Sequence, residues 1–186
     1  MPVLDGRYSN ARWVASPNYG VRPAGVEIDL VVVHNISLPP GEFGGGHIER
    51  FFQNRLDYDE HPYFDTIAGL EVSAHALIDR TGAVTQFVNF NDRAWHAGVS
   101  SWEERSDCND FSIGIELEGT DSVPYTSAQY DALVDVVADL IRAYPELNRK
   151  GIAGHADIAP GRKTDPGRAF EWQYFFQQLD VVLSEA

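Results

Sequence analysis

The clearest pattern of apolar positions along the chain predicts a long amphipathic helix. From about Ser127 to Tyr144, apolar residues recur at intervals of three and four, the spacing that places side chains on one face of an α-helix. Thr126 and Gln129 fit a capping box at its start, and Pro145 blocks its continuation. A second amphipathic helix is predicted from about Ala169 to Leu183.

Other patterns predict strands. The run from Ile28 to Val33 is apolar and rich in β-branched residues, which is typical of a strand buried on both faces. From Phe111 to Leu117, apolar and polar residues alternate, which indicates a strand with one polar face. Two apolar segments, 73–78 and 83–88, flank the turn residues 79–82 and predict an antiparallel hairpin.

The remaining segments complete an outline of the fold. Residues 37–46 contain two prolines and four glycines and therefore predict a loop, followed by a short helix from about His47 to Leu56. No internal repeat or linker is visible in the sequence. Strands mixed with helices predict an α/β or α+β fold, a single domain over residues 1–186 in which helices cover a sheet.

Charge and composition narrow the partners and the compartment. A formal net charge of -14 repels nucleic acids and anionic lipid surfaces, although the acidity has the simpler alternative role of solubility. The chain has no run of roughly 18 apolar residues and no export signal at its start. Its one cysteine, Cys108, cannot form an intrachain disulfide. We therefore expect a cytoplasmic protein that binds neither nucleic acid nor membrane, with no obligate protein partner evident.

Three residues are candidates for a metal site. His34 ends the first strand, and His155 lies in a polar loop rich in glycine and proline, where side chains can converge. Asp165, ten residues later, supplies a carboxylate, and a hydrolytic zinc site takes such donors while keeping one corner free for water. Each residue also has an ordinary alternative, because a lone histidine is usually structural and Asp165 fits a turn before Pro166 and Gly167. Spacing alone leaves the choice open, since no short motif such as HExxH is present.

Two further residues suit the chemistry of such a site. Lys163 lies two residues before Asp165, so an extended backbone places both side chains on one face, where an ammonium could hold developing negative charge. Otherwise Lys163 is a solvated loop lysine. Glu116, on the polar face of its strand, is either a general base or a solvent-facing carboxylate, and Glu103 and Glu118 compete with it for the role of base.

A family resemblance is carried by five segments: HNISLPPGEFGG, SAHALI, RAWHAG, CNDFSIGIELEGTD and GHADIAPGRKTDPG. Through these segments, in this order, the chain resembles the cytoplasmic 1,6-anhydro-N-acetylmuramyl-L-alanine amidases over most of its length. The resemblance implies the fold of zinc amidases related to peptidoglycan recognition proteins, a central mixed sheet flanked by helices with the metal in a surface groove. It also implies the reaction, hydrolysis of the amide between the lactoyl group of 1,6-anhydro-N-acetylmuramic acid and L-alanine in peptidoglycan recycling. The substrate would be a small soluble anhydro-muropeptide.

The resemblance implies roles for the candidate residues. His34, His155 and Asp165 match the family's ligands for one zinc ion per chain. Glu116 and Lys163 match its catalytic pair. These assignments come from the matching segments and go beyond what the spacing of the residues indicates.

Residues that contact the substrate are predicted less directly. Asn35, Tyr63 and Trp95, with His96, are expected to line the groove, where an aromatic face packs against a sugar and amides bind peptide carbonyls. Trp95 has the alternative of being simply a core residue. His75 is expected to be structural or to support a ligand.

Recognition of the stem peptide is left open by two acidic residues. Some relatives place arginines where this chain has Glu71 and Asp107, and arginines would suit the carboxylates of a diaminopimelate-containing stem. Arg105 is close in sequence and is a candidate substitute.

Three competing functions remain at this point. A lytic amidase acting on intact peptidoglycan is disfavoured because no signal peptide or wall-binding module is visible. A non-catalytic peptidoglycan-binding module has the same fold, but a pure binder has no need of three metal ligands, a base and a lysine together. A Ser-His-Asp hydrolase would be expected to carry a GxSxG elbow, which the sequence lacks.

Overall fold

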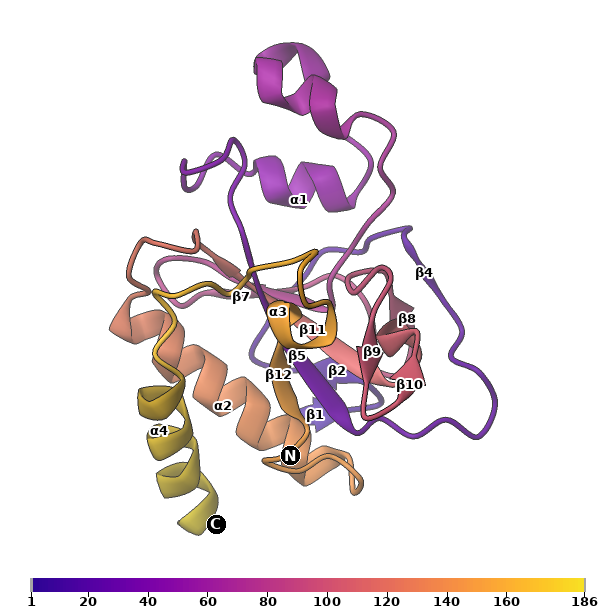
Figure 1. The fold of residues 1–186 in the computed structure, drawn as a ribbon, viewed down its shortest axis with the longest axis vertical. Helices are drawn as coiled ribbons and strands as arrows, with labels where there is room; N and C mark the ends of the chain where they lie inside the picture. The colour runs from indigo at the N-terminus through magenta and orange to yellow at the C-terminus, as the bar shows by residue number, and fades with distance from the viewer. Residues whose placement is uncertain (1, 186) are drawn as a thin grey trace.

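The computed structural model describes residues 2–185 and is built around a six-stranded mixed sheet (Figure 1). In spatial order its strands are β12 (Ile152–Gly154), β5 (Leu30–Ile36), β11 (Ser112–Glu118), β6 (Ala76–Ile78), β7 (Val84–Gln86) and β3 (Arg12–Trp13). The first four strands are mutually parallel, and β6 and β7 form the predicted antiparallel hairpin. The prediction of a central mixed sheet is confirmed.

The two central strands, β5 and β11, pair in parallel along their whole length. One face of the pair, which includes Val31 and Ile113, packs into the main apolar core under the helices. The other face carries Leu30 and Val32 into a smaller core that also contains Ala97. Because both faces are covered, every residue of β11 is buried. The predicted alternation is present, and of the two alternatives for Glu116 its burial excludes a solvent-facing carboxylate.

Helices α2 (Ser127–Ala143) and α4 (Trp172–Ser184) cover one face of the sheet and run side by side in Figure 1. Tyr130 and Tyr174 pack edge to face between them, with ring centroids 5.2 Å apart. The capping box of Thr126 with Gln129 is present as predicted. Neither α2 nor α4 contains a predicted site residue. The two helices support the face of the sheet on which they pack.

Residues 37–72, which we call the upper segment, lie above the end of the sheet in Figure 1. The segment contains α1 (His47–Phe52) and the 3-10 helices η1 (Tyr58–Glu60) and η2 (Pro62–Ile67). Its apolar side chains form a separate core with residues of the hairpin, where the rings of Phe52 and Phe87 pack edge to face at 5.1 Å. This second core fixes the segment over the sheet.

The other elements are short. They are the helix α3 (His155–Ile158), the 3-10 helix η3 (Cys108–Asp110), and the paired strands β1 (Val3–Leu4) with β2 (Arg7–Tyr8), β4 (Tyr19–Gly20) with β8 (Arg93–Ala94), and β9 (Ser101–Trp102) with β10 (Arg105–Ser106). Within residues 2–185, no helix has both the length and the apolar character needed to cross a membrane.

Candidate active site

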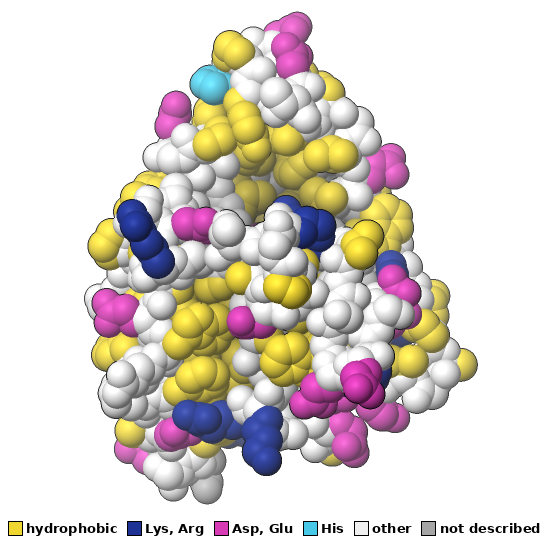
Figure 2. Space-filling model, viewed as in Figure 1, with side chains coloured by type: hydrophobic (Ala, Val, Ile, Leu, Met, Phe, Trp, Pro, Cys, Tyr) yellow, Lys and Arg dark blue, Asp and Glu magenta, His cyan; other side chains and the backbone are white. Residues whose placement is uncertain are grey.

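A cavity of about 400 Å³ opens between the upper segment and the carboxyl ends of the parallel strands. Every residue that the sequence predicted for the metal site, the catalytic pair or substrate binding lines it, with the exception of Arg105. Apolar side chains gather on the side of the hollow formed by the upper segment (Figure 2). The opposite wall carries the polar residues, so the cavity has an apolar and a polar side.

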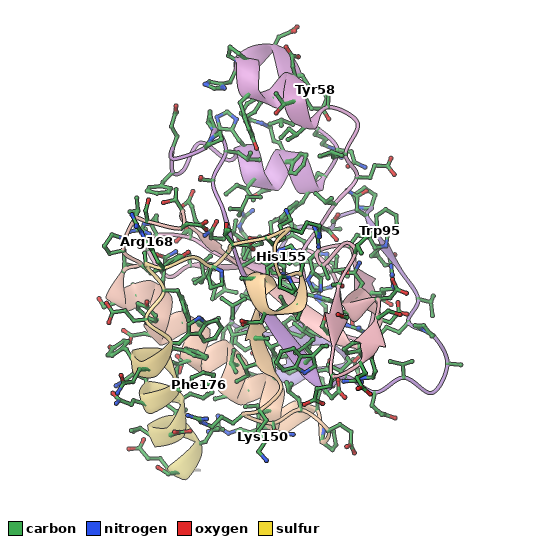
Figure 3. All side chains as sticks on the ribbon, viewed as in Figure 1. Tyr58, Trp95, Lys150, His155, Arg168 and Phe176 are labelled. Carbon is green, nitrogen blue, oxygen red and sulfur yellow. The ribbon has the colours of Figure 1, made fainter. Side chains whose placement is uncertain are left out.

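Strand order brings the polar residues together. His34 on β5 is the direct register partner of Glu116 on β11, so the two side chains lie on the same face of neighbouring strands. Gly154 at the end of β12 pairs with Val33, which places His155 beside His34. Figure 3 shows His155 at the start of α3, at the upper end of the sheet. Such ends of parallel strands are the usual place for a ligand in an open sheet with crossover helices.

Three donor atoms converge at this point. The Nδ1 atoms of His34 and His155 lie 2.9 Å apart, and the Oδ2 atom of Asp165 lies 3.2 Å from the first and 3.1 Å from the second. The three residues form a group that could hold a metal ion. Two imidazole nitrogens and one carboxylate oxygen, open to the cavity on the fourth side, fit zinc in a hydrolytic site.

The protonation states of these groups suit metal binding. Burial lowers the pKa of His34 to about 4, so its imidazole is neutral near pH 7, the form that binds metal. Burial alone would raise the pKa of Asp165, but the two adjacent imidazoles outweigh burial and bring the pKa below its usual value. The group is therefore an ionised carboxylate. Both conditions arise from side chains that the fold places within the same small volume.

The loop that follows α3 is held in place around Asp165. Its backbone carbonyl accepts a hydrogen bond from the Ala156 N–H at 2.9 Å, which ties the loop to the first turn of α3. Nearby, Asp121 accepts hydrogen bonds from the Asn35 side chain at 2.9 Å and from the Thr164 hydroxyl. The sequence did not single out Asp121, because its partners come from distant parts of the chain.

Glu116 has the properties of a general base. It is 9% exposed, and its buried Oε2 atom has no hydrogen-bond partner. Burial, and next the nearby carboxylate of Asp165, raise the pKa of Glu116 well above its usual value, while Lys163 opposes the shift. Glu116 also lines the cavity, and a carboxyl group with a raised pKa beside a ligand site can exchange protons.

The two competing glutamates have other positions. Glu118 is occupied on both oxygens, which accept hydrogen bonds from the backbone N–H groups of Gly44 at 2.6 Å and Arg80 at 3.2 Å. It therefore holds the loop of the upper segment to the hairpin. Glu103 lines a separate depression. The position of Glu116 in the cavity thus distinguishes it from both alternatives.

Lys163 lies at the junction of three hollows. It is exposed and lines the main cavity together with two depressions beside it. Its ammonium group is therefore free to meet a ligand that enters from any of them. An exposed lysine over a cluster of metal-binding groups can stabilise negative charge that develops on a substrate.

The predicted substrate-binding residues differ in what they offer. Asn35 donates both amide hydrogens to protein oxygens, those of Asp121 at 2.9 Å and Pro166 at 3.1 Å, so only its carbonyl oxygen remains for a ligand. Tyr63, on η2, is 36% exposed. Trp95 is half-buried and faces the cavity and the adjoining depression, where Figure 3 labels it beside the loop after β8.

Arg105 does not reach the cavity. Its guanidinium pairs with Asp29, with Nη1 2.9 Å from Oδ2, and lies 4.0 Å from the centre of the Phe111 ring. It lines a separate depression with Trp102 and Lys150. We therefore leave Arg105 out of the substrate-binding set.

Glu71 and Asp107, the two acidic residues that left stem-peptide recognition open, are on the surface. Glu71 lines the depression beside the main cavity, together with Arg162 and Lys163. Asp107 is exposed and precedes η3 with a left-handed backbone, φ 59°. Arg162, which the sequence did not single out, donates hydrogen bonds to the carbonyls of Ala97 at 2.6 Å and Val99 at 2.7 Å.

The other histidines near the site are neutral. Burial lowers the pKa of His75 to about 3, and this side chain accepts a hydrogen bond from Gly114 N–H at 3.0 Å and donates one to the Asp92 carbonyl at 3.0 Å. This structural role agrees with the prediction for His75. Burial, and next the adjacent His34, hold the pKa of His96 well below its usual value. Its Nδ1 atom lies 2.9 Å from Nε2 of His34.

Comparisons with known proteins agree with this geometry. The family model of N-acetylmuramoyl-L-alanine amidases matches residues 24–168. The chain is 57% identical over 175 residues to the 1,6-anhydro-N-acetylmuramyl-L-alanine amidase AmpD of Escherichia coli K12, covering 94% of this chain and 95% of that protein.

Solved structures give the same result. A crystal structure of a selenomethionine derivative of AmpD superposes with a TM-score of 0.93 at 53% identity, covering 96% of this chain and 99% of that chain. The amidase AmiD of Escherichia coli was solved with the substrate anhydro-N-acetylmuramic acid-L-Ala-D-γ-Glu-L-Lys. It matches with a TM-score of 0.60 at 31% identity, covering 84% of this chain and 60% of that chain.

Proposed function

The chain belongs to the N-acetylmuramoyl-L-alanine amidase family, and from that premise we propose that it is a zinc-dependent hydrolase of anhydro-muropeptides. The bond cleaved joins the lactoyl group of 1,6-anhydro-N-acetylmuramic acid to L-alanine of the stem peptide. Similarity to the AmpD amidases supports this choice of substrate. We further propose that residues 1–186 act as one amidase domain in the cytoplasm, in peptidoglycan recycling.

One observation carries the proposal: a metal-binding group lies beside an unpartnered buried carboxyl. His34, His155 and Asp165 direct three donor atoms at one point, and Glu116, whose buried Oε2 atom has no hydrogen-bond partner, lines the same cavity. A module that only binds its ligand has no need of this combination. The arrangement therefore supports an enzyme over a recognition protein.

We propose that His34, His155 and Asp165 hold the zinc ion. When bound, zinc would supply a water of lowered pKa and polarise the lactoyl carbonyl. Glu116 accepts a proton from the attacking water molecule while the water oxygen forms a bond to the carbonyl carbon. Lys163 stabilises the resulting oxyanion. Glu116 then delivers the proton to the alanine nitrogen, the carbon–nitrogen bond breaks, and the products are a free lactoyl carboxylate and a free amine.

The walls of the cavity suit an amphipathic substrate. Tyr63 and Trp95 offer aromatic surface for a sugar or lactoyl group, and the carbonyl oxygen of Asn35 remains able to accept a hydrogen bond from a peptide N–H. At the stem end, Glu71 lies beside Arg162 in the adjoining depression. Equal kcat/KM for substrates with L-lysine and with diaminopimelate would show that the enzyme does not recognise the additional carboxylate of diaminopimelate.

The proposal is tested by identifying the products. Wild-type protein is incubated with a purified anhydro-muropeptide, and mass spectrometry should find anhydro-N-acetylmuramic acid and the intact stem peptide. Glu116→Gln should lose activity by roughly 100-fold or more with zinc content unchanged, whereas Glu103→Gln, which alters an exposed carboxylate lining a separate depression, serves as the control. Cleavage at another bond, or full activity of Glu116→Gln, would contradict the proposal.

A further inference from the structure

The two histidines of the metal-binding group are oriented through different partners. Both point Nδ1 at the group, so Nε2 must carry the proton if Nδ1 is to bind a metal. For His155, Nε2 lies 3.0 Å from the carbonyl oxygen of Ala97, which can only accept, and a longer 3.4 Å from Nη2 of Arg162, so the shorter contact favours a proton on Nε2. For His34 the partner of Nε2 is His96 Nδ1, at 2.9 Å. An imidazole nitrogen can donate or accept, so this contact alone leaves the proton undetermined.

A chain of hydrogen bonds beyond His96 removes the ambiguity. The Ser112 hydroxyl lies 2.5 Å from the carbonyl oxygen of Cys108, which can only accept, so the single hydroxyl proton points there. The Ser112 oxygen must then accept from His96 Nε2, at 3.2 Å. With one proton on the His96 ring, placed on Nε2 by Ser112, Nδ1 is left to accept from His34 Nε2. His34 is left with a bare Nδ1 facing His155 and Asp165.

We propose that His96, ordered by Ser112, is a positioning residue that holds His34 in the Nε2–H tautomer, so that Nδ1 is free to bind zinc. This inference rests on the proposed zinc centre. The opposite proton order would place a hydrogen on His34 Nδ1, where it would bond to Asp165 Oδ2 at 3.2 Å. That internal hydrogen bond would compete with the metal. The hydrogen-bond chain through His96 thus favours the tautomer whose Nδ1 can bind zinc over the tautomer whose Nδ1–H bonds to Asp165.

The surroundings of His96 are built to fix its ring. A Cβ atom at Gly114 would lie 2.4 Å from the His96 Cγ atom, so only glycine at this position of β11 allows the imidazole to lie against the strand. The Asn109 side-chain oxygen accepts hydrogen bonds from the backbone N–H groups of His96 at 3.0 Å and Ala97 at 2.8 Å. Asn109 therefore fixes the backbone of both residues that contact the metal-binding histidines: His96, which contacts His34, and Ala97, whose carbonyl contacts His155.

The test compares two substitutions of similar shape at position 96. His96→Leu removes the acceptor for His34 Nε2–H, whereas His96→Asn can place a carbonyl oxygen close to the lost Nδ1. Zinc affinity of the full chain is measured by competition with a chromophoric chelator, and folding is checked by thermal unfolding. Loss of such a supporting partner weakens metal binding by roughly 10- to 100-fold, so we expect this loss in His96→Leu and near wild-type affinity in His96→Asn.

A second variant keeps the test decisive if His96→Leu does not fold. Ser112→Ala leaves the His96 ring in place but removes the acceptor that orders its proton, and we expect a smaller loss of zinc affinity. In zinc-free wild-type protein, ¹⁵N spectra of the histidine side chains should show His34 protonated on Nε2, and Ser112→Ala should show a mixture of tautomers.

Several results would overturn the inference while leaving the zinc centre intact. These are wild-type affinity in His96→Leu, equally weak binding in His96→Asn and His96→Leu, or a zinc-free His34 protonated on Nδ1. By contrast, a wild-type protein that binds no zinc at all would refute the proposed function itself. The two failures are therefore distinguishable.

Discussion

The two walls of the cavity are built on different principles. On the sheet wall, His34, His155 and Glu116 are nearly inaccessible, at 2%, 4% and 9% exposure, and rigid strands set their positions. On the wall formed by the upper segment, Tyr63 on η2 and Leu70, three residues after the end of η2, are 36% and 50% exposed, and a small separate core supports the segment.

This difference predicts that substitutions of single atoms have larger effects on the sheet wall than on the wall formed by the upper segment. Groups on the sheet wall act at fixed distances and in defined protonation states, so replacing one atom should abolish or alter the reaction. Contacts from the upper segment offer apolar area, in which each side chain contributes a small share. Substitutions on the two walls should therefore affect different steps, chemistry on the sheet side and binding on the upper side.

The largest effect is expected from Asp165→Asn. The substitution keeps the shape of the side chain but removes the charge that balances a cation, so zinc affinity should fall by more than the roughly 100-fold seen for indirect partners, and hydrolysis should cease. Zinc content and turnover are measured together. Asp131→Asn, the same change at an exposed residue of α2, is the control. Full zinc occupancy in Asp165→Asn would show that Asp165 is not a ligand.

A smaller effect is expected from Lys163→Ala. Because the ammonium group acts on the oxyanion and not on the metal, turnover should fall by about 100-fold while zinc stays bound. Steady-state kinetics and metal analysis measure both quantities. Lys150→Ala, at an exposed lysine that lines a separate depression, should have no effect. Near-normal turnover would remove Lys163 from the mechanism.

Stability should depend on pH through His75. Burial lowers its pKa from 6.5 to about 3, so the unfolded chain binds the proton more readily than the folded one. The stabilisation is therefore complete above pH 6.5 and lost as pH falls towards 3. Between pH 7 and pH 5 the free energy of unfolding should drop by about 2 kcal/mol from this group. Urea unfolding of wild type and His75→Gln measures the difference, and equal slopes against pH would contradict it.

The smallest effect is expected on the upper wall. Tyr63→Ala removes aromatic surface at the cavity edge, so KM should rise about fivefold, for a loss of roughly 1 kcal/mol, with little change in kcat. Tyr19→Ala alters an exposed aromatic residue that does not line the main cavity and is the control. A large fall in kcat for Tyr63→Ala would place Tyr63 in the chemistry and remove the contrast between the walls.

Local patterns predicted the elements that depend on local interactions. The helix α2 ends within one residue of its predicted bounds, because an amphipathic repeat, a capping box and a proline all act within a few residues. The hairpin of β6 and β7 follows from its turn residues in the same way. The short helix α3 was not predicted, since four residues carry no periodic pattern.

The site depends on contacts that sequence spacing does not show. Alternation placed Glu116 on the face opposite the isoleucines, but that face is covered by another core that includes Ala97 and Cys108, so the sequence pattern left the burial of Glu116 open. His34 and His155 meet only because β12 lies next to β5. The resemblance to a family pattern assigned them as zinc ligands, a choice that their spacing left open. The resemblance gave no indication of the role proposed for His96.

The central claim is that a zinc ion held by His34, His155 and Asp165 is required for hydrolysis. The most direct measurement follows cleavage of an anhydro-muropeptide by mass spectrometry before chelation, after complete removal of metal, and after zinc is restored, with metal analysis at each stage. The account predicts one zinc ion per chain, loss of cleavage on its removal and recovery on its return. Full cleavage by metal-free protein would contradict it.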